Sequence, residues 1–267
     1  MAPHIDFHRG GPGYAWAYRA VLEAEEVDCF LVFGTAHAGL DGHPFALTRK
    51  PYATPLGPLE LDDEVLEAVV RRAPGDPFAA EAAHRREHSV EFQAVSIRYA
   101  AARRPAGPGP RFVPILASFA HECLASGRDP ADDPRVTGTL DAVAEAMAAV
   151  PRRYCLVAGA DLAHVGPQFG DPTPVSGDDL ATIDREDRAM LAHVTAGDAA
   201  GFLRSVGADG DRRRICGLSP IYTVLRLLPA SAGRLLHYGQ WPNPHGTVTF
   251  ASVAFESPAA PADGAAR

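Results

Sequence analysis

Two histidines follow short apolar runs that are typical of buried strands. His37 comes shortly after the run Cys29–Phe33. His164 follows the run Tyr154–Ala158, and Asp161 lies between them. In open α/β sheets, ligands bind beyond the carboxyl ends of the strands, so these side chains are expected to converge at one rim of a sheet. Because imidazole can bind a metal or exchange a proton near neutral pH, His37 and His164 are candidate functional residues.

His4 and Cys216 are two further candidates. His4 lies at the start of the sequence, where a strand would normally precede it, so we expect that this strand is trimmed or that the start codon is assigned downstream of the true one. Cys216 follows three arginines (212–214) and comes just before a predicted helix. A helix N-terminus and nearby arginines favour a thiolate, which is a metal ligand or a nucleophile.

The segment Glu87-His88-Ser89-Val90-Glu91 contains one more candidate. Ser89 is predicted to cap a helix there, and the acidic residues favour the positive end of that helix. This local explanation accounts for Ser89 and the acidic residues but not for His88. Most of the other histidines and cysteines lack a comparable context and are interpreted as core or surface residues: His43, His84, His121, His193, His237, His245, Cys29, Cys123 and Cys155.

Strand-like and helical segments alternate along the chain, which is typical of an α/β fold. The predicted strands are Cys29–Phe33, Phe112–Leu116, Tyr154–Ala158, Leu235–Tyr238 and Val248–Phe255. The predicted helices are Tyr14–Ala24, Asp62–Arg72, Ser89–Ala102, Val136–Ala149, Thr182–Leu191 and Pro220–Leu228. We expect one domain over residues 1–256, with a central mixed sheet flanked by helices, and a disordered tail rich in Ala, Pro and Gly over residues 257–267.

The composition excludes several classes of protein. The 267 residues are 46% hydrophobic and 22% charged, and the formal net charge is −8. An acidic balance argues against nucleic-acid binding, which needs clustered Lys and Arg. The 4 cysteines form no CxxC pair, which argues against a disulfide framework. No apolar run reaches the roughly 18 residues of a membrane span, and the N-terminus lacks a signal segment, so we expect a cytoplasmic protein without membrane contacts.

Eight short segments, taken in order, resemble the motifs of one family over almost the whole chain. They are Pro3-His4 with Gly10-Gly11 and Tyr18, Gly34-Thr35-Ala36-His37, Thr54-Pro55-Leu56-Gly57, Glu87-His88-Ser89-Val90-Glu91, Pro114-Ile115-Leu116, Asp161-Leu162-Ala163-His164, Ile215-Cys216-Gly217 and Ser252-Val253-Ala254-Phe255. The ordered set resembles the Memo-like family, also called AmmeMemoRadiSam system protein B. That family is similar to the LigB-type class III extradiol dioxygenases, non-haem iron enzymes that open catechol rings, and the resemblance implies their α/β fold.

The resemblance also implies a metal site. His4, His37 and Cys216 fall where the family places its metal-binding triad. Asp161 and His164 fall where it lines the same pocket, and Asp161 is expected to hold His164 in one tautomer for proton transfer. The implied cofactor is a divalent metal ion, Fe(II) first, with Zn or Cu as alternatives, because a thiolate is a softer ligand than the carboxylate of the dioxygenases. Ring-opening activity is therefore not assumed.

His88 is assigned to the same pocket by analogy with a second histidine of the dioxygenases. The sequence also departs from the family pattern at three places. Ile5-Asp6-Phe7-His8-Arg9 follows Pro3-His4, so His8 is an alternative or additional ligand. Gly159 and Ala160 stand where the family usually has serines, and Gly239-Gln240-Trp241-Pro242-Asn243 replaces a Thr-Ser-Gly-Asp-type segment.

Three functions follow from these residues. The first is a Memo-like metal-binding protein, interpreted as a mononuclear non-haem iron oxidoreductase that acts beside radical-SAM and AMMECR-type protein partners on an unidentified small molecule or peptide. The second is a non-catalytic module that binds a peptide or protein partner in the same pocket. The third is nucleophilic catalysis by Cys216 with His37 or His164, which is less favoured because no elbow or oxyanion-hole motif accompanies it.

Overall fold

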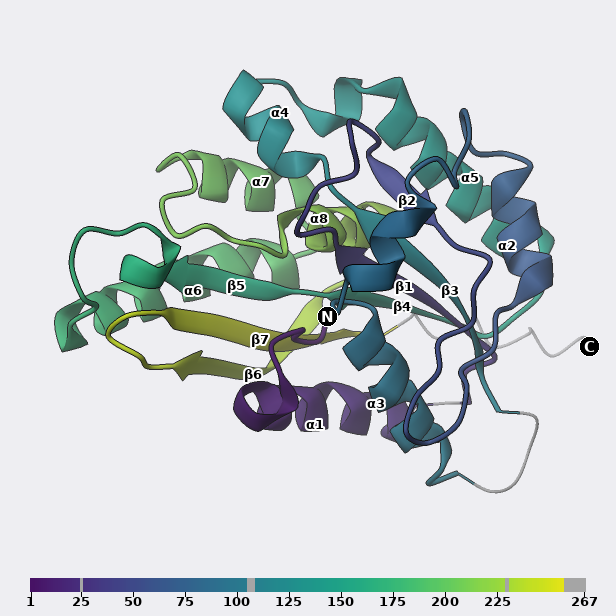
Figure 1. Cartoon of the computed structure of the whole chain (residues 1–267), viewed down its shortest axis with the longest axis horizontal. Coiled ribbons are helices and arrows are strands. Elements are labelled where there is room, and N and C mark those ends of the chain that lie inside the picture. Colours follow the sequence, from purple (N-terminus) through teal and green to yellow (C-terminus); the bar gives the residue numbers. More distant parts are fainter. Residues whose placement is uncertain (25, 105–108, 229–230, 257–267) are drawn as a thin grey trace, which may run out of the picture.

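Two β-sheets form the centre of the molecule, and helices cover them (Figure 1). This computed structural model describes residues 1–24, 26–104, 109–228 and 231–256. The first sheet has the order β2-β3-β1-β4, and the second has the order β5-β7-β6. The strands are β1 (Cys29–Thr35), β2 (Phe45–Leu47), β3 (Arg111–Ala117), β4 (Tyr154–Gly159), β5 (Asp161–Val165), β6 (Gly233–Trp241) and β7 (Thr247–Phe255).

The first sheet is mixed and the second is antiparallel. β1 pairs in parallel with β3 and β4, whereas β2 runs antiparallel to β3. Every residue of β1 is buried, which explains its continuous apolar sequence, since parallel strands are covered on both faces. The prediction of a single α/β domain with a mixed sheet is confirmed.

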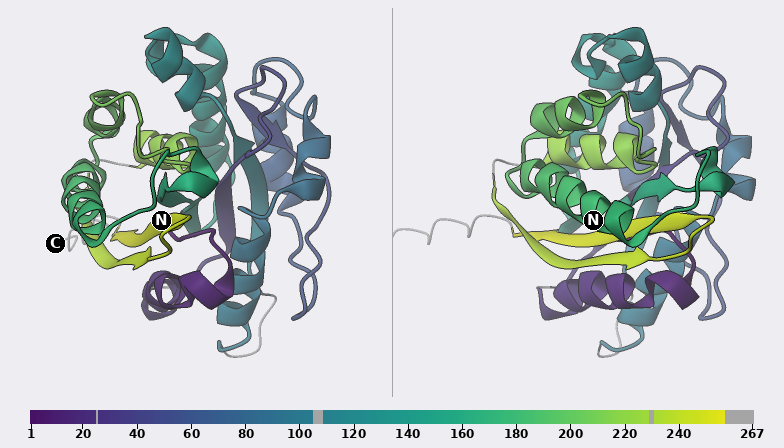
Figure 2. Two further views of the ribbon diagram at one scale, coloured as in Figure 1. Left: turned by 60° about the vertical axis from the view of Figure 1, so that its left-hand side comes forward. Right: turned by 90° about the vertical axis from the view of Figure 1, so that its left-hand side faces the viewer.

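Helices pack on both sheets. α8 contacts β4 and β1 of the first sheet, and α1 contacts β6 and β7 of the second. In Figure 2, α1 lies along one side of β6 and β7, and α6 lies along the other. The α-helices are α1 (Phe7–Glu23), α2 (Asp63–Val70), α3 (Glu91–Ala101), α4 (Ala120–Ser126), α5 (Pro134–Ala149), α6 (Gly177–Thr195), α7 (Ala199–Gly207) and α8 (Leu218–Leu227). Short 3-10 helices cover η1 (Glu81–Arg86), η2 (Pro130–Asp132) and η3 (Pro167–Phe169).

Some elements differ from the sequence expectation. α1 begins at Phe7 rather than at Tyr14, because the side chain of Asp6 accepts a hydrogen bond from the backbone N–H of Arg9 and caps the helix. The elements β2, β5, α4 and α7 were not predicted at all. The tail at 257–267, for which we expected disorder, lies outside the described residues. In the described parts of the chain, no helix combines the length and apolarity that crossing a bilayer demands.

The N-terminal residues lie between the two sheets (Figure 1). The backbone N–H of Ala2 donates to Ala158 O of β4 at 2.9 Å. The terminal amine of Met1 donates to Val253 O of β7, also at 2.9 Å. The chain also passes directly from β4 of the first sheet to β5 of the second at Ala160. Residues just after the N-terminus and just after β4 are therefore held where the two sheets meet.

Candidate metal centre

Three side chains from separate segments meet at this junction. The candidate ligand atoms of His4, His37 and Cys216 all lie within 4.8 Å of one another. Cys216 Sγ lies 3.2 Å from His4 Nε2, and the centroids of the two imidazole rings are 4.9 Å apart. An ion with bonds of about 2.0 to 2.3 Å keeps its donors within a few ångströms of one another, so this spacing fits a shared ion.

His4 is fixed by two hydrogen bonds. Its ring Nδ1 lies 2.8 Å from Gly159 O, and its backbone N–H donates to Asp161 Oδ1 at 2.9 Å. Because the carbonyl oxygen can only accept, Nδ1 carries the proton and Nε2 presents a lone pair towards Cys216. Burial, followed by the proximity of His37, lowers the pKa of His4 to about 3. The ring is therefore neutral near pH 7, as a metal ligand must be.

His37 follows the end of β1 and is oriented by Glu87. The carboxylate accepts from the backbone N–H of His37 at 2.9 Å and lies 2.9 Å from its ring Nδ1. Burial alone would raise the pKa of Glu87, but the hydrogen bond and charge of His37, with the N–H of Ser89, bring it to about 2. Glu87 is thus an ionised partner of Nδ1–H, which leaves Nε2 of His37 free for an ion.

Glu87 is the site residue that sequence reasoning missed. The segment around it was interpreted as a helix cap, but α3 begins at Glu91 and its N-cap, Val90, makes no side-chain capping bond. Ser89 Oγ donates instead to Thr35 O at 2.8 Å. The capping interpretation is therefore wrong. The available signal was the carboxylate next to His88 in a segment that carried the family resemblance.

Cys216 lies in the loop before α8. Its backbone O accepts from Thr35 Oγ1 at 3.0 Å, which connects the loop to the end of β1. Burial, followed by the negative charge of Asp161, raises the pKa of the thiol well above its usual range. This is the opposite of the shift expected from the arginines at 212–214. They form ion pairs with carboxylates of their own and leave the thiol unassisted: Arg212 with Glu186, Arg213 with Asp187 and Arg214 with Asp171.

Asp161 and His164 follow the carboxyl end of β4, as expected, but they lie in a further strand, β5. Burial raises the pKa of Asp161 to about 6, although the N–H of His4 opposes the shift. His164 Nδ1 lies 3.1 Å from Leu162 O, and burial lowers the pKa of the ring. Within the described ranges, no hydrogen bond joins the Asp161 carboxylate to the His164 ring. Asp161 therefore orients His4, and His164 takes its tautomer from the carbonyl of its own strand.

His88 joins the cluster, whereas His8 does not. The His88 ring stacks on His37 with centroids 4.8 Å apart and 14° between the planes. Its Nδ1 lies 3.5 Å from Glu87 Oε1. The ring of His8 lies 5.5 Å from that of Trp241 instead. Of the two N-terminal histidines, the fold brings His4 to Cys216.

A second set of possible ligands is formed by His37, Glu87 and His88. The 2.9 Å separation of His37 Nδ1 and the carboxylate is a hydrogen bond, which leaves no space for an ion between them. We therefore treat Glu87 as a partner of the triad. The side chains of His37 and His88 are 38% and 44% exposed, whereas His4 is 1% exposed, so solvent reaches the cluster from the His37 side.

Two glycines let the segments approach each other this closely. A Cβ at Gly159 would lie 2.5 Å from Ser89 O. A Cβ at Gly217 would lie 2.5 Å from the Cβ of Ala160 and 2.6 Å from Asp161 O. A side chain at Gly159 would push β4 away from the segment that carries His88, and one at Gly217 would push the Cys216 loop away from the start of β5. Gly159 therefore matches the close packing of this chain.

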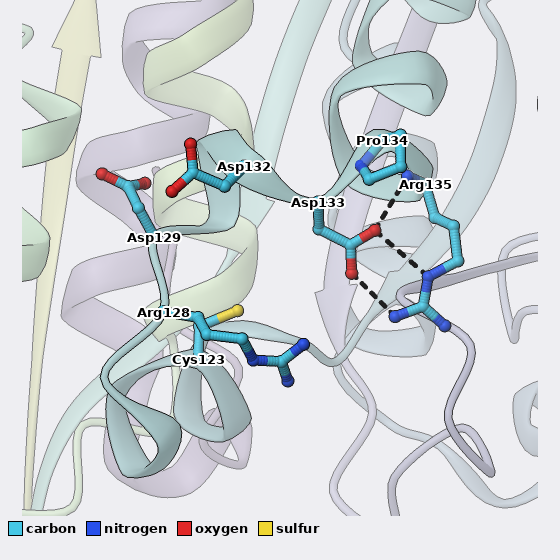
Figure 3. A pocket seen from close by; sticks show the side chains of 7 residues that line it. All are labelled: Cys123, Arg128, Asp129, Asp132, Asp133, Pro134 and Arg135. Carbon is cyan, nitrogen blue, oxygen red and sulfur yellow. Dashed lines mark hydrogen bonds and ion pairs between the residues drawn. The ribbon is translucent and has the colours of Figure 1, made fainter.

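A separate cavity of about 330 Å³ lies beside α4, η2 and the start of α5 (Figure 3). Its charged groups are largely satisfied by each other and by nearby groups. The carboxylate of Asp133 accepts from the guanidinium of Arg135, and Arg128 donates to Glu122. None of the candidate metal ligands lines it. The lining residues are Cys123, Arg128, Asp129, Asp132, Asp133, Pro134 and Arg135.

Comparison with known proteins identifies the family. The sequence model of the Memo-like protein family matches residues 1–256. A MEMO1 family protein of Methanopyrus kandleri is 27% identical over 241 residues, which cover 89% of this chain and 74% of the relative. A MEMO1 family protein of Pyrococcus abyssi is 28% identical over 89% of this chain and 78% of its own length. One from Aquifex aeolicus is 27% identical over 89% of this chain but only 58% of its own. The chain belongs to the Memo-like protein family.

Proposed function

We propose that this protein is a metal-dependent member of its family in which His4, His37 and Cys216 hold one divalent ion, Fe(II) first, with Zn and Cu as competitors. The observation that carries the proposal is the state of the donor atoms. Both imidazoles have Nδ1 engaged by an acceptor, and the thiol faces the free Nε2 of His4. This is the arrangement in which a second set of hydrogen bonds orients histidine ligands for a metal.

The donor set also matches the chemistry of an open metal site. Two imidazoles and one thiolate leave coordination positions free, and the thiolate favours soft or borderline metals over Mg or Ca. When bound, such an ion would polarise or activate a ligand in its open positions. A dioxygenase-like oxidoreductase reaction is the activity we propose for this site.

The surrounding residues supply proton transfer and orientation. His164 donates its Nδ1–H to Leu162 O, so Nε2 is the basic nitrogen, and its lowered pKa keeps it neutral near pH 7. A neutral Nε2 can accept a proton from a substrate group. His88, stacked on His37 at the exposed side, is the proposed second proton-transfer residue. Asp161 orients His4 through its backbone N–H.

The alternative name of the resembled family, AmmeMemoRadiSam system protein B, supports a further proposal about partners. We propose radical-SAM and AMMECR-type proteins as partners in the cytoplasm, and a small molecule or a peptide as the substrate. Co-purification of a tagged copy of this protein with such partners tests the first part.

The test of the metal site is a metal analysis of protein purified without oxygen. Wild-type protein and Cys123→Ser are expected to hold about one iron per chain, whereas Cys216→Ser and His37→Ala are expected to hold much less. Cys123 is the matched control because it is also a free cysteine but lies in α4, away from the triad. Equal iron content in wild type and Cys216→Ser would refute the triad. Peptide binding that is indifferent to a chelator would instead favour the binding module.

A further inference from the structure

The loop that carries Cys216 has a strained backbone. Asp211 and Arg214 have φ angles of 54° and 53°, in the left-handed region that residues other than glycine rarely adopt. Such residues persist only where surrounding contacts enforce them, and they concentrate at functional sites. The contacts that enforce this loop are therefore informative about how Cys216 is positioned.

Backbone hydrogen bonds align the loop with the edge strand β5. The N–H of His164 donates to Arg213 O at 2.7 Å, and the N–H of Cys216 donates to Leu162 O at 3.3 Å. The N–H of Gly217 donates to Asp161 O at 3.0 Å. Cys216 and His164 therefore lie on two segments that are hydrogen-bonded side by side. A shift of the loop along β5 would change the distance between them.

Arg214 connects the Cys216 loop and β5 to the segment that carries Asp171. Its Nη2 donates to Asp171 Oδ1 at 2.6 Å, and its Nη1 donates to Asp171 Oδ2 at 3.2 Å and to His164 O at 3.1 Å. Asp171 Oδ2 also accepts from the N–H of Gly166 at 2.6 Å, just after β5 ends. A guanidinium that spans a carboxylate fixes direction as well as distance. The other two arginines of the loop make no such connection to His164 O among the described hydrogen bonds.

We propose that Arg214 and Asp171 form a positioning pair that holds Cys216 and His164 at a fixed separation beside the candidate metal centre. Neither residue of the pair belongs to a candidate ligand group of the described chain. It enforces the left-handed conformation at Arg214 and anchors the carboxyl end of β5. The part of this inference that concerns ion binding rests on the proposed metal site, whereas the effect on the thiol does not.

The test compares Arg214→Asn with Arg212→Asn. Asparagine adopts the left-handed conformation readily, so the first variant removes the guanidinium without adding backbone strain. Arg212 is the matched control because it lies in the same loop and pairs with Glu186 and Asp209 at the surface, so the same charge is removed. Circular dichroism of both variants confirms that the fold is kept.

Two measurements test the positioning pair separately from the proposed metal site. In chelator-treated protein, iodoacetamide should label Cys216 about three- to fivefold faster in Arg214→Asn, because losing a partly exposed ion pair makes local opening easier. In cobalt-loaded protein, affinity should fall about tenfold and the thiolate-to-cobalt absorption band should shift, as expected when an outer partner of a ligand is lost. Arg212→Asn should match wild type in both experiments. If wild-type protein binds no cobalt, the proposed metal site is refuted, whereas the labelling rates still test the positioning pair.

A conservative variant and a double variant provide a second test of the positioning pair. Arg214→Lys keeps the charge but not the two-pronged contact, so it should show an intermediate labelling rate. If Arg214 and Asp171 act as one unit, adding Arg214→Asn to Asp171→Asn should change the labelling rate no further. Equal labelling rates and spectra in wild type, Arg214→Asn and Arg212→Asn would overturn the proposal, as would fully additive effects of the two substitutions.

Discussion

Replacing Asp161 with asparagine should change how the stability of the metal-free protein depends on pH. The carboxyl is 2% exposed, and burial raises its pKa from 3.8 to about 6. The folded chain therefore binds this proton more tightly than the unfolded chain, so the contribution of this carboxyl to wild-type stability falls as pH rises from about 4 through 6. The full penalty above that range is about 3 kcal/mol, at about 1.4 kcal/mol for each pH unit of pKa difference.

Asparagine is neutral at every pH and can still accept the hydrogen bond from the N–H of His4 through Oδ1. Relative to wild type, Asp161→Asn should therefore gain about 2 kcal/mol of stability between about pH 4.5 and pH 7.5, since roughly 1 kcal/mol of the penalty is already present at the lower pH. Urea unfolding of chelator-treated wild type and variant at four pH values measures this difference. A constant offset between the two proteins would come from packing and would not count. A stability difference that stays flat with pH, or that shrinks as pH rises, would refute the reasoning.

Three further predictions concern the same site. Glu87→Gln removes the negative partner of His37 Nδ1–H and should weaken metal binding about tenfold in a chelator competition, whereas unchanged affinity would show that the carboxylate does not tune the ligand. Because the pKa of the Cys216 thiol is raised, binding must expel its proton, and metal affinity should increase about tenfold for each unit of pH near neutrality. Calorimetry in buffers of different ionisation heat counts that proton, and a count of zero would exclude thiolate ligation. Gly159→Ser places a Cβ 2.5 Å from Ser89 O and should destabilise the fold by about 1 to 3 kcal/mol in urea unfolding, with wild-type stability as the contradicting outcome.

The sequence predicted the parts of the fold that local patterns determine. The buried apolar runs became β1, β3 and β4, and the alternating run near the C-terminus became β7. The switch between sheets at Ala160 was missed, because the strand was expected to end at Ala158 and the residues after it were interpreted as a rim segment, whereas a new strand, β5, begins at Asp161. Which of two sheets a strand joins depends on its distant partners. The pairing of β5 with β7 therefore could not be predicted from its own residues.

The candidate ligands came from the resemblance and from residue types, and the structure brings the three of them together. Their partners were harder to predict. Glu87 has a local explanation as a helix-start acid, whereas its actual contact, His37, is distant in the sequence. The positive charge expected to act on Cys216 was misjudged for the same reason. A run of arginines shows charge, but not which carboxylates the fold brings to it, and Asp171 is one of them.

Only Ala160 separates β4 of the first sheet from β5 of the second, and the candidate ligands His4, His37 and Cys216 lie beside this connection. An ion bound there would stabilise the contact between the two sheets, so loss of the metal would also destabilise the three-stranded sheet. Amide exchange along β5 and β7 should then slow on loading and quicken on stripping. The amide exchange rate of this sheet would then report whether the metal site is occupied, even though the substrate is unidentified.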